Sequence, residues 1–298
     1  MPEGPPFFIV GSARSGTTLL RLILNAHPDV AVPPESRFIT ELYEGRDKVE
    51  VDRLLDRLAT HQRFAAWDVP IEDVRRELSG SRARYSEIMT AAYSAYTRLQ
   101  KKSRWGDKTP RYVESIPLLA RLFPEAKFIH LIRDGRNVAL SYADVPFGPK
   151  SIVKVAALWA QRVAAGMLDG RPLHGDRYHE MLYEDLVEDA AGEIKSTCEF
   201  LELEFDPEML DYTERAGDAM LPRAERFNPR VTDGTIAAGR SWQDVMPNRQ
   251  VELFEAVAGP VLSELGYERR YPEPGLGARI SATLGRWGLP VGLLKKRR

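Results

Sequence analysis

The stretch from Phe7 to Asn25, FFIVGSARSGTTLLRLILN, limits the fold of this chain more than any other segment. Its apolar start predicts a short buried strand over Phe7–Val10, and the apolar spacing after the loop predicts a helix over Thr17–Asn25. Small residues between them let the backbone curl, so that successive N–H groups point inward at the positive end of the helix. The sequence therefore predicts an anion cradle between a strand and a helix.

The spacing of this loop is that of a P-loop, G-x-x-x-x-G-K-S/T, with one change. Thr17, followed by Thr18, stands where nucleotide hydrolases and kinases carry lysine. The fixed cation is instead Arg14, inside the loop. Because the P-loop lysine draws charge from β- and γ-phosphates beside Mg²⁺, its replacement favours a less highly charged transferring group. A turn that binds nothing is the alternative, but packing alone would favour apolar residues here.

The segment RSGTTLLRLIL, followed by NAHPDV and PPESRFI, resembles the 5′-phosphosulfate loop of sulfotransferases that use 3′-phosphoadenosine 5′-phosphosulfate (PAPS). The resemblance is closest to tyrosylprotein sulfotransferases and to bacterial sulfotransferases like them. It continues, in the family's order, through WGDKTPRYVESIPLLARLFPEAKFIHLIRDGRNVALSY and LYEDLVEDAAGEIKSTCEFLEL. The resemblance implies that the 5′-phosphosulfate is held by the loop residues Arg14, Ser15, Gly16, Thr17, Thr18 and Leu19.

Strands and helices alternate along the rest of the chain. Further strands are predicted over Lys127–Ile132 and Tyr178–Leu182. Helical patterns cover Lys48–Gln62, Tyr85–Lys101, Asp134–Ala143, Ile152–Leu168, Glu193–Leu201 and Val251–Leu265. This alternation predicts an α/β fold with a parallel sheet covered on both faces. The resemblance implies the P-loop-type, three-layer α/β/α sulfotransferase fold with a central parallel sheet.

Arg133 and Ser141 follow the predicted strand Lys127–Ile132. Ligands of open α/β sheets bind at the carboxyl ends of the strands, where this pair falls. The alternative is an arginine that pairs with its neighbouring aspartate and an ordinary helical serine. The resemblance implies that the two residues hold the 3′-phosphate of PAPS. Tyrosylprotein members carry a further basic residue where this chain has Val145, and Arg136 or Lys150 could replace it.

Lys108 and Glu35 are the candidate catalytic residues, together with Arg14. The proline at position 110 predicts an extended or turning loop around Lys108. The resemblance implies that Lys108 stabilises charge on the departing phosphate and that Glu35 takes the proton of the acceptor hydroxyl. The alternatives are a surface lysine paired with Asp107 and a glutamate that faces Arg37 or a helix dipole.

Two later positions complete the predicted site. Tyr183 matches a family position near the nucleotide, although tyrosines at strand ends are often structural. Arg240 lies in GRSW, which resembles a loop that closes over 3′-phosphoadenosine. Phe227 aligns with a serine that assists catalysis in tyrosylprotein members, so we do not expect that contact here. The polar stretch 218–240 is predicted to be a mobile lid.

Composition excludes several other classes of protein. The chain has 298 residues, 43% of them apolar, and a formal net charge of −1, so nothing global predicts nucleic-acid binding. The single cysteine, Cys198, excludes an internal disulfide and a multi-cysteine metal site. No signal peptide and no membrane-spanning run is recognised, so a cytoplasmic location is expected.

We expect a sulfotransferase domain over residues 1–275 and a basic amphipathic tail over 276–298, which could pack on its own domain or contact an anionic membrane. The predicted reaction needs no metal. It moves the sulfuryl group from PAPS to a hydroxyl of an acceptor: a peptide tyrosine, a glycan, a glycolipid or a small molecule. Two alternatives stay open at this point, a P-loop kinase or NTPase and a catalytically silent nucleotide-binding protein.

Overall fold

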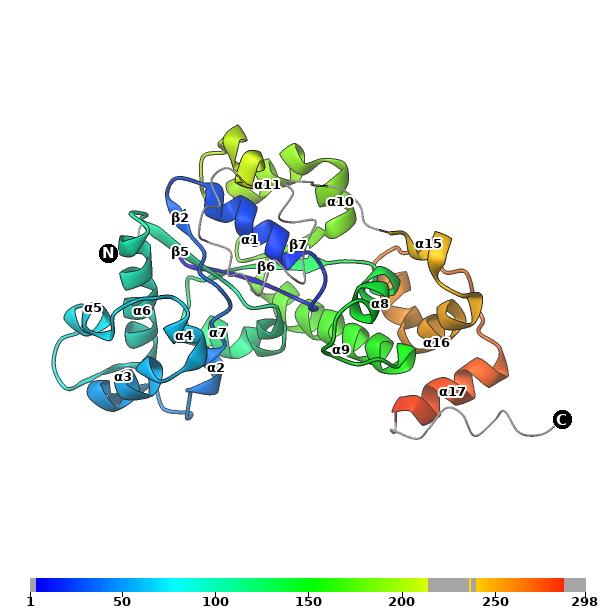
Figure 1. Ribbon diagram of the computed structural model, residues 1–298, viewed down its shortest axis with the longest axis horizontal. Helices are drawn as coiled ribbons and strands as arrows, with labels where there is room; N and C mark the ends of the chain where they lie inside the picture. Colours follow the sequence, from blue (N-terminus) through cyan, green and yellow to red (C-terminus); the bar gives the residue numbers. More distant parts are fainter. Residues whose placement is uncertain (1–3, 214–235, 237–239, 287–298) are drawn as a thin grey trace.

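A computed structural model describes residues 4–213, residue 236 and residues 240–286. At its centre lies a five-stranded, wholly parallel sheet with the order β2-β5-β1-β6-β7 (Figure 1). The strands are β1 (Phe7–Gly11), β2 (Val30–Ala31), β5 (Arg104–Lys108), β6 (Lys127–Ile132) and β7 (Tyr178–Leu182). The predicted parallel sheet is therefore confirmed, together with the predicted strands β1, β6 and β7.

Helices cover both faces of this sheet (Figure 1). In β1, Phe7 and Ile9 pack toward α1, whereas Phe8 and Val10 pack into a second core on the opposite face. One layer contains α1 (Thr17–Ala26), α10 (Tyr183–Glu188) and α11 (Ala190–Leu201). The other contains α7 (Ile116–Leu122), α8 (Gly135–Ala143) and α9 (Ile152–Gly170). Because both faces are buried, β1 and most of β6 are almost continuously apolar, as expected for a parallel sheet.

Residues 37–101 form a helical lobe between β2 and β5 (Figure 1). It contains α2 (Phe38–Glu41), α3 (Val51–Ala59), α4 (Gln62–Ala65), α5 (Ile71–Arg76) and α6 (Tyr85–Leu99), with the antiparallel hairpin of β3 (Lys48–Glu50) and β4 (Arg82–Arg84). The helix predicted over Lys48–Gln62 is wrong at its start, since the first three residues pair with β4 and the helix ends at Ala59. Pairing with a strand distant in the sequence outweighs local helical periodicity there.

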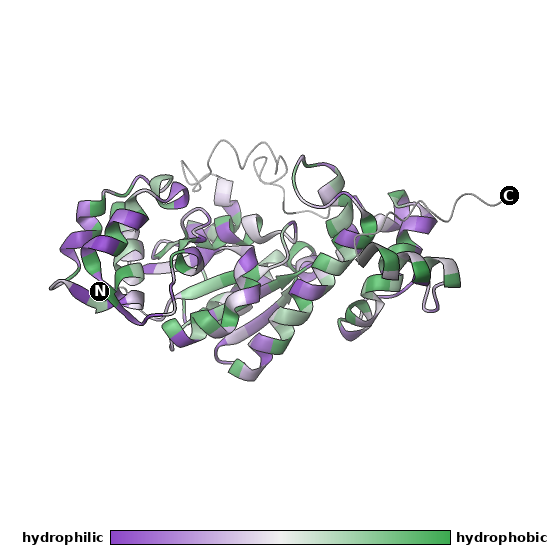
Figure 2. Ribbon diagram, turned by 90° about the horizontal axis from the view of Figure 1, so that it is seen from below, coloured by the Kyte–Doolittle hydropathy of each residue, from purple (hydrophilic) through white to green (hydrophobic). Residues whose placement is uncertain are grey.

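The last described elements pack beside α8 and α9. They are α15 (Trp242–Val245), α16 (Asn248–Glu264) and α17 (Leu276–Arg286). Short 3₁₀ turns occur earlier in the chain, at η1 (Pro110–Ser115), η2 (Arg171–Leu173) and η3 (Pro207–Asp211). Helix α17 begins the predicted tail and contacts α9 and α16 through the buried Ala278 and Ala282. Figure 2 shows hydrophilic and hydrophobic residues interspersed along these helices.

Within the described ranges, no helix is both long and apolar enough to cross a bilayer. Residues 287–298 of the predicted tail lie outside the described residues. The division of the chain at residue 275, membrane contact by the tail and a cytoplasmic location all stay predictions.

Candidate functional site

The loop between β1 and α1 has the backbone shape of an anion cradle. Arg14 and Gly16 both adopt left-handed conformations, with φ of 71° and 93°. A Cβ atom added at Gly16 would lie 2.3 Å from the Tyr183 ring, so only glycine fits this turn. The hydroxyls of Ser12 and Ser15 are buried and have no hydrogen-bond partner in the described part of the chain. These unpartnered hydroxyls and the uncapped N-terminus of α1 suit an anionic group.

The residues that follow the loop differ in what they offer a ligand. Thr17 is buried at the start of α1, and Thr18 lies beside Lys108, with 3.5 Å between the Thr18 Oγ1 and the Lys108 Nζ. The Leu19 side chain packs into the core between α1 and the sheet, so only its backbone faces the loop. Of the predicted loop residues, Leu19 is therefore the one whose side chain serves packing.

Lys108 and Glu35 meet at this edge of the sheet. Lys108 is the last residue of β5, where the sequence predicted only an extended or turning loop, and it is buried. Its Nζ donates a hydrogen bond to Glu35 Oε1 over 3.1 Å. Arg37 lies on the other side of the glutamate, with 3.6 Å between its Nη2 and Glu35 Oε2. The surface-lysine alternative is therefore wrong, because Lys108 is enclosed and paired with Glu35.

Burial and neighbouring charges shift the pKa values of both Glu35 and Lys108. Burial alone would raise the pKa of Glu35, but the charge and hydrogen bond of Lys108, with the charges of Arg37 and Arg63, hold that pKa below its usual value. Burial lowers the pKa of Lys108, and the nearby Arg21 adds to this, while Glu35 acts in the opposite direction. The contact places a carboxyl group that can act as base against a lysine that can act as donor, next to the anion cradle.

A network of hydroxyl groups, which the sequence did not reveal, ties the two catalytic candidates together. The Ser36 backbone N–H donates to Thr109 Oγ1 over 3.1 Å, and Ser36 Oγ lies 2.8 Å from Tyr112 Oη. Ser36 follows Glu35 and Thr109 follows Lys108, so these contacts fix one segment against the other. The only available signal was the closeness of Thr109 and Tyr112 to Lys108, which does not identify Ser36 as a partner.

Asp107 is a buried carboxyl group that the sequence offered only as an alternative partner of Lys108. Tyr93 Oη donates to its Oδ2 over 2.6 Å, and both residues are buried beneath the Lys108 segment. Burial raises the pKa of Asp107 to about 6, although hydrogen bonds from Tyr93 and its neighbours oppose the shift. The side chain points into the helical lobe and anchors the end of β5 there, since its hydrogen-bond partner is on α6.

Arg14, Arg133 and Ser141 form a second cluster at the ends of β1 and β6. Arg14 Nε donates to Ser141 Oγ over 2.9 Å, and Arg133 Nη1 donates to the Arg14 carbonyl oxygen over 3.3 Å. The Arg133 guanidinium lies 4.5 Å from the centre of the Tyr183 ring. Burial and the charge of Arg133 lower the pKa of Arg14. The buried Arg133 Nε has no hydrogen-bond partner among the described residues, so the cluster can accept an anion.

The two cations suggested as replacements at Val145 both make other contacts in the structure. Arg136 is buried and bonded to two carboxylates, with 2.8 Å to Asp134 and 2.6 Å to Glu255. Lys150 donates to the carbonyl oxygens at the end of α8, including that of Val145. Arg136 is thus committed to buried carboxylates, and Lys150 contacts the backbone at the end of α8, so replacement of the family's basic residue stays a prediction.

Arg240 is exposed and forms an ion pair with Asp144, the residue that ends α8. Most of the predicted lid, 218–240, and Phe227 lie outside the described residues. Among the described residues, no group of three or more His, Cys, Asp or Glu side chains is arranged to hold a metal ion.

A polar cavity opens beside the Glu35–Lys108 pair. Its volume is about 380 Å³, and it is lined by Arg37, Thr40, Glu41, Thr109, Arg111, Tyr112, Glu114 and Ser115. Arg37 contacts Glu35 directly, and Thr109 follows Lys108, so the cavity adjoins the catalytic candidates. The cavity reaches the pair through Arg37 and Thr109, since neither Glu35 nor Lys108 is part of its lining.

The chain is similar in sequence to protein-tyrosine sulfotransferases of several animals. The chain is 27% identical over 292 residues to a protein-tyrosine sulfotransferase of Drosophila melanogaster, an alignment that covers 92% of this chain and 54% of the relative. It is 26% identical over 297 residues to protein-tyrosine sulfotransferase 1 of Danio rerio, covering 92% of this chain and 75% of the relative. The chain thus spans about half the length of the fly protein.

Two solved structures share the fold. The sulfotransferase domain from the curacin biosynthetic pathway superposes with a TM-score of 0.59 at 20% identity, covering 90% of this chain and all of that one. The sulfotransferase domain of the Synechococcus PCC 7002 olefin synthase gives 0.60 at 23% identity, covering 90% and 96%. The profile of the Sulfotransferase family matches residues 5–207, which include the cradle, the Glu35–Lys108 pair and the arginine cluster. This chain belongs to the sulfotransferase family.

Proposed function

We propose that the protein transfers the sulfuryl group of PAPS to a hydroxyl group of an acceptor, with Glu35 as the general base. The observation that supports this most directly is the contact of Lys108 with Glu35, over 3.1 Å, beside the loop cradle. One group of the pair can take a proton and the other can stabilise an anion. Sulfuryl transfer to an alcohol or phenol needs both functions within a few ångströms.

The proposed step balances without a metal or a redox partner. The acceptor oxygen forms a bond to sulfur as the bond from sulfur to the bridging phosphate oxygen breaks. The acceptor proton goes to Glu35, and the electron pair of the broken bond stays on the phosphate, where Lys108, Thr18 and the loop amides stabilise the negative charge. Burial of Lys108 strengthens this interaction, since little water screens it.

The arginine cluster supports PAPS as the sulfuryl donor. Arg133 and Ser141 are proposed to bind the 3′-phosphate, with Arg14 bridging between that group and the 5′ side. The stacked Tyr183 keeps the Arg133 guanidinium in place. Arg240, at the edge of this cluster beside Asp144, is proposed to contact the same ligand from the far side.

The polar cavity next to Glu35 is the proposed acceptor site. Its size falls in the range of small-molecule pockets, about 300–1,000 Å³. A peptide tyrosine is the first acceptor to test, since the curated relatives named above are protein-tyrosine sulfotransferases. Glycans, glycolipids and small phenols or alcohols present the same reacting hydroxyl. Family membership does not favour a kinase or NTPase.

Glu35→Gln tests the proposal. We expect turnover from PAPS to fall by about 10²–10⁴-fold, the usual loss on removing a general base. Binding of 3′-phosphoadenosine 5′-phosphate, measured by calorimetry without metal, should stay close to that of the wild type, because the glutamine keeps the shape of the site. Glu114→Gln is the matched control, as Glu114 lines the same cavity but does not touch Lys108.

Two results would contradict the proposal separately. Near-normal turnover of Glu35→Gln would remove this residue as the base. Binding of ATP by the wild type as tightly as 3′-phosphoadenosine 5′-phosphate would instead remove PAPS as the donor.

A further inference from the structure

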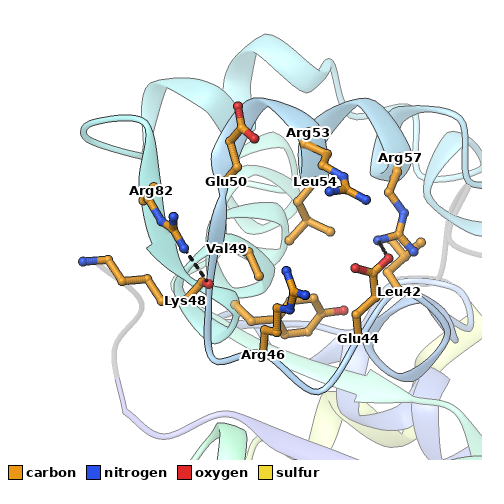
Figure 3. A pocket seen from close by; sticks show the side chains of 11 residues that line it. Leu42, Glu44, Arg46, Lys48, Val49, Glu50, Arg53, Leu54, Arg57 and Arg82 are labelled. Carbon is orange, nitrogen blue, oxygen red and sulfur yellow. Dashed lines mark hydrogen bonds and ion pairs between the residues drawn. The ribbon is translucent and has the colours of Figure 1, made fainter.

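A second cavity lies in the helical lobe, formed by different residues from the proposed PAPS and acceptor sites (Figure 3). Its volume is about 140 Å³. Five basic side chains and two acidic ones surround it: Arg46, Lys48, Arg53, Arg57, Arg82, Glu44 and Glu50. They come from the segment after α2, from the β3–β4 hairpin and from α3, so the tertiary structure gathers them from three parts of the lobe. An anionic ligand would be favoured by this excess of positive charge.

Several of these charges are not used by the fold. The side chains of Arg46, Lys48 and Arg53 make no hydrogen bond or ion pair with any other described residue. Arg57 is different, because its Nη1 lies 2.7 Å from Glu44 Oε1. In Figure 3 the Arg46 and Arg53 guanidinium groups both reach into the hollow between the labelled side chains. Two guanidinium groups that face one space are the usual means of binding a phosphate or sulfate group.

The floor of the cavity is apolar. Leu42 and Leu54 are buried there, with Val49 and the ring of Tyr85 beside them. The Tyr85 hydroxyl donates to the backbone of α2, 2.9 Å from the Ile39 carbonyl oxygen, so it offers no further proton to a ligand. A bare inorganic ion would leave this floor uncovered. An anion carried on a small apolar group would cover it, which gains roughly 25 cal/mol per Å² buried.

We propose that this cavity binds a small phosphate or sulfate monoester, with the anion between Arg46 and Arg53 and the carbon skeleton on the Leu42–Leu54 floor. The volume suits a ligand with a benzene-sized group, which an apolar cavity of about 150 Å³ accommodates. The site does not depend on the proposed sulfuryl transfer, since it shares no lining residue with the cavity beside Glu35. Its connection to that cavity is α2, because Glu41 lines one and Leu42 the other.

Calorimetry with phenyl phosphate and phenyl sulfate tests this assignment on the full chain. Saturating 3′-phosphoadenosine 5′-phosphate is added first, so that the loop cradle and the arginine cluster are occupied. Inorganic phosphate and inorganic sulfate test the anion alone, and phenol tests the floor alone. We expect phenyl phosphate and phenyl sulfate to bind more tightly than the inorganic anions and more tightly than phenol. Arg53→Ala should weaken ester binding about tenfold, as expected for one charge-assisted hydrogen bond.

Two variants make the test specific. Glu44→Gln releases Arg57 from its ion pair and should tighten ester binding several-fold. Arg76→Ala removes one positive charge from the exposed surface of α5, outside the cavity, and should leave ester binding unchanged. No saturable ester binding, or equal losses in Arg53→Ala and Arg76→Ala, would overturn the site. Equal affinity for inorganic phosphate and phenyl phosphate would overturn its assignment to an ester.

Discussion

The two ends of the proposed PAPS site are built in different ways. At the lysine end, Lys108 and Glu35 are paired with each other, and a network through Ser36 and Thr109 fixes both segments. At the arginine end, Arg14 and Arg133 lie close together with the same charge, and Arg133 keeps an unpartnered Nε among the described residues. At the lysine end the two reacting groups are thus paired with each other without a ligand, whereas at the arginine end two cations lie side by side.

This difference indicates whether each end contributes mainly to turnover or mainly to ligand affinity. A balanced, buried pair adds little to the affinity for a ground-state ligand but is already placed for charge that develops during reaction. Two neighbouring guanidinium groups repel each other until an anion lies between them, so their stabilisation appears on binding. Variants at the lysine end should therefore change turnover, and variants at the arginine end should change affinity.

Lys108→Ala should give the largest effect. We expect kcat to fall about 10³-fold, because the leaving phosphate loses a donor in a buried site and Glu35 loses its partner. Affinity for 3′-phosphoadenosine 5′-phosphate should change much less. Steady-state kinetics and calorimetry on one preparation measure both quantities. A loss mainly in affinity for 3′-phosphoadenosine 5′-phosphate, with kcat within tenfold of the wild type, would contradict the proposed difference between the two ends.

Arg136→Ala should act on stability. Removing this buried arginine leaves Asp134 and Glu255 unpaired, which costs about 3 kcal/mol or more in the free energy of unfolding. Urea unfolding measures that loss. The fraction that stays folded should keep its preference for 3′-phosphorylated ligands, since Arg136 does not reach the arginine cluster. A selective loss of that preference would restore Arg136 as a ligand for the 3′-phosphate.

Arg133→Ala should weaken binding of 3′-phosphoadenosine 5′-phosphate by about 10–100-fold, as expected for a lost charge-assisted contact. Binding of AMP, which lacks the 3′-phosphate, should hardly change. Competition calorimetry with the two nucleotides gives the ratio of their dissociation constants for the variant and for the wild type. Arg240→Ala, at an exposed residue of the same proposed site, should have a smaller effect on binding. Equal weakening for both nucleotides would place Arg133 elsewhere on the ligand.

The smallest effect concerns pH. Glu35 must be ionised to act as base, and its pKa lies below 4.5, so activity should fall only in acid below that value. Lys108 must be protonated, and its pKa lies below 10.5, so the alkaline limb should begin before that value. Lys108→Arg should move the alkaline limb upward, since arginine keeps its proton. An acid limb near neutral pH in kcat/KM would indicate a different base.

Much of this architecture could be predicted because it depends on neighbours in the sequence. The apolar run Phe7–Val10 and the small residues after it specify a strand and a tight loop locally, and the structure confirms both. Strand β5 was missed because Arg104–Lys108 has almost no apolar pattern, yet it is buried between β2 and β1. Burial on both sides makes it a strand, and a sequence window does not record which strands lie beside it.

By itself, the sequence determined the α/β class, the loop cradle and the presence of Arg14, Glu35, Lys108 and Arg133, because residue type and local spacing decide these. Only the tertiary structure brought Lys108 to Glu35, 73 residues away, since the register of parallel strands sets which ends meet. It also committed Arg136 to Asp134 and Glu255, because a buried guanidinium needs carboxylate partners. The same packing of distant segments left Arg46 and Arg53 without an ion pair among the described residues, around the cavity of the helical lobe.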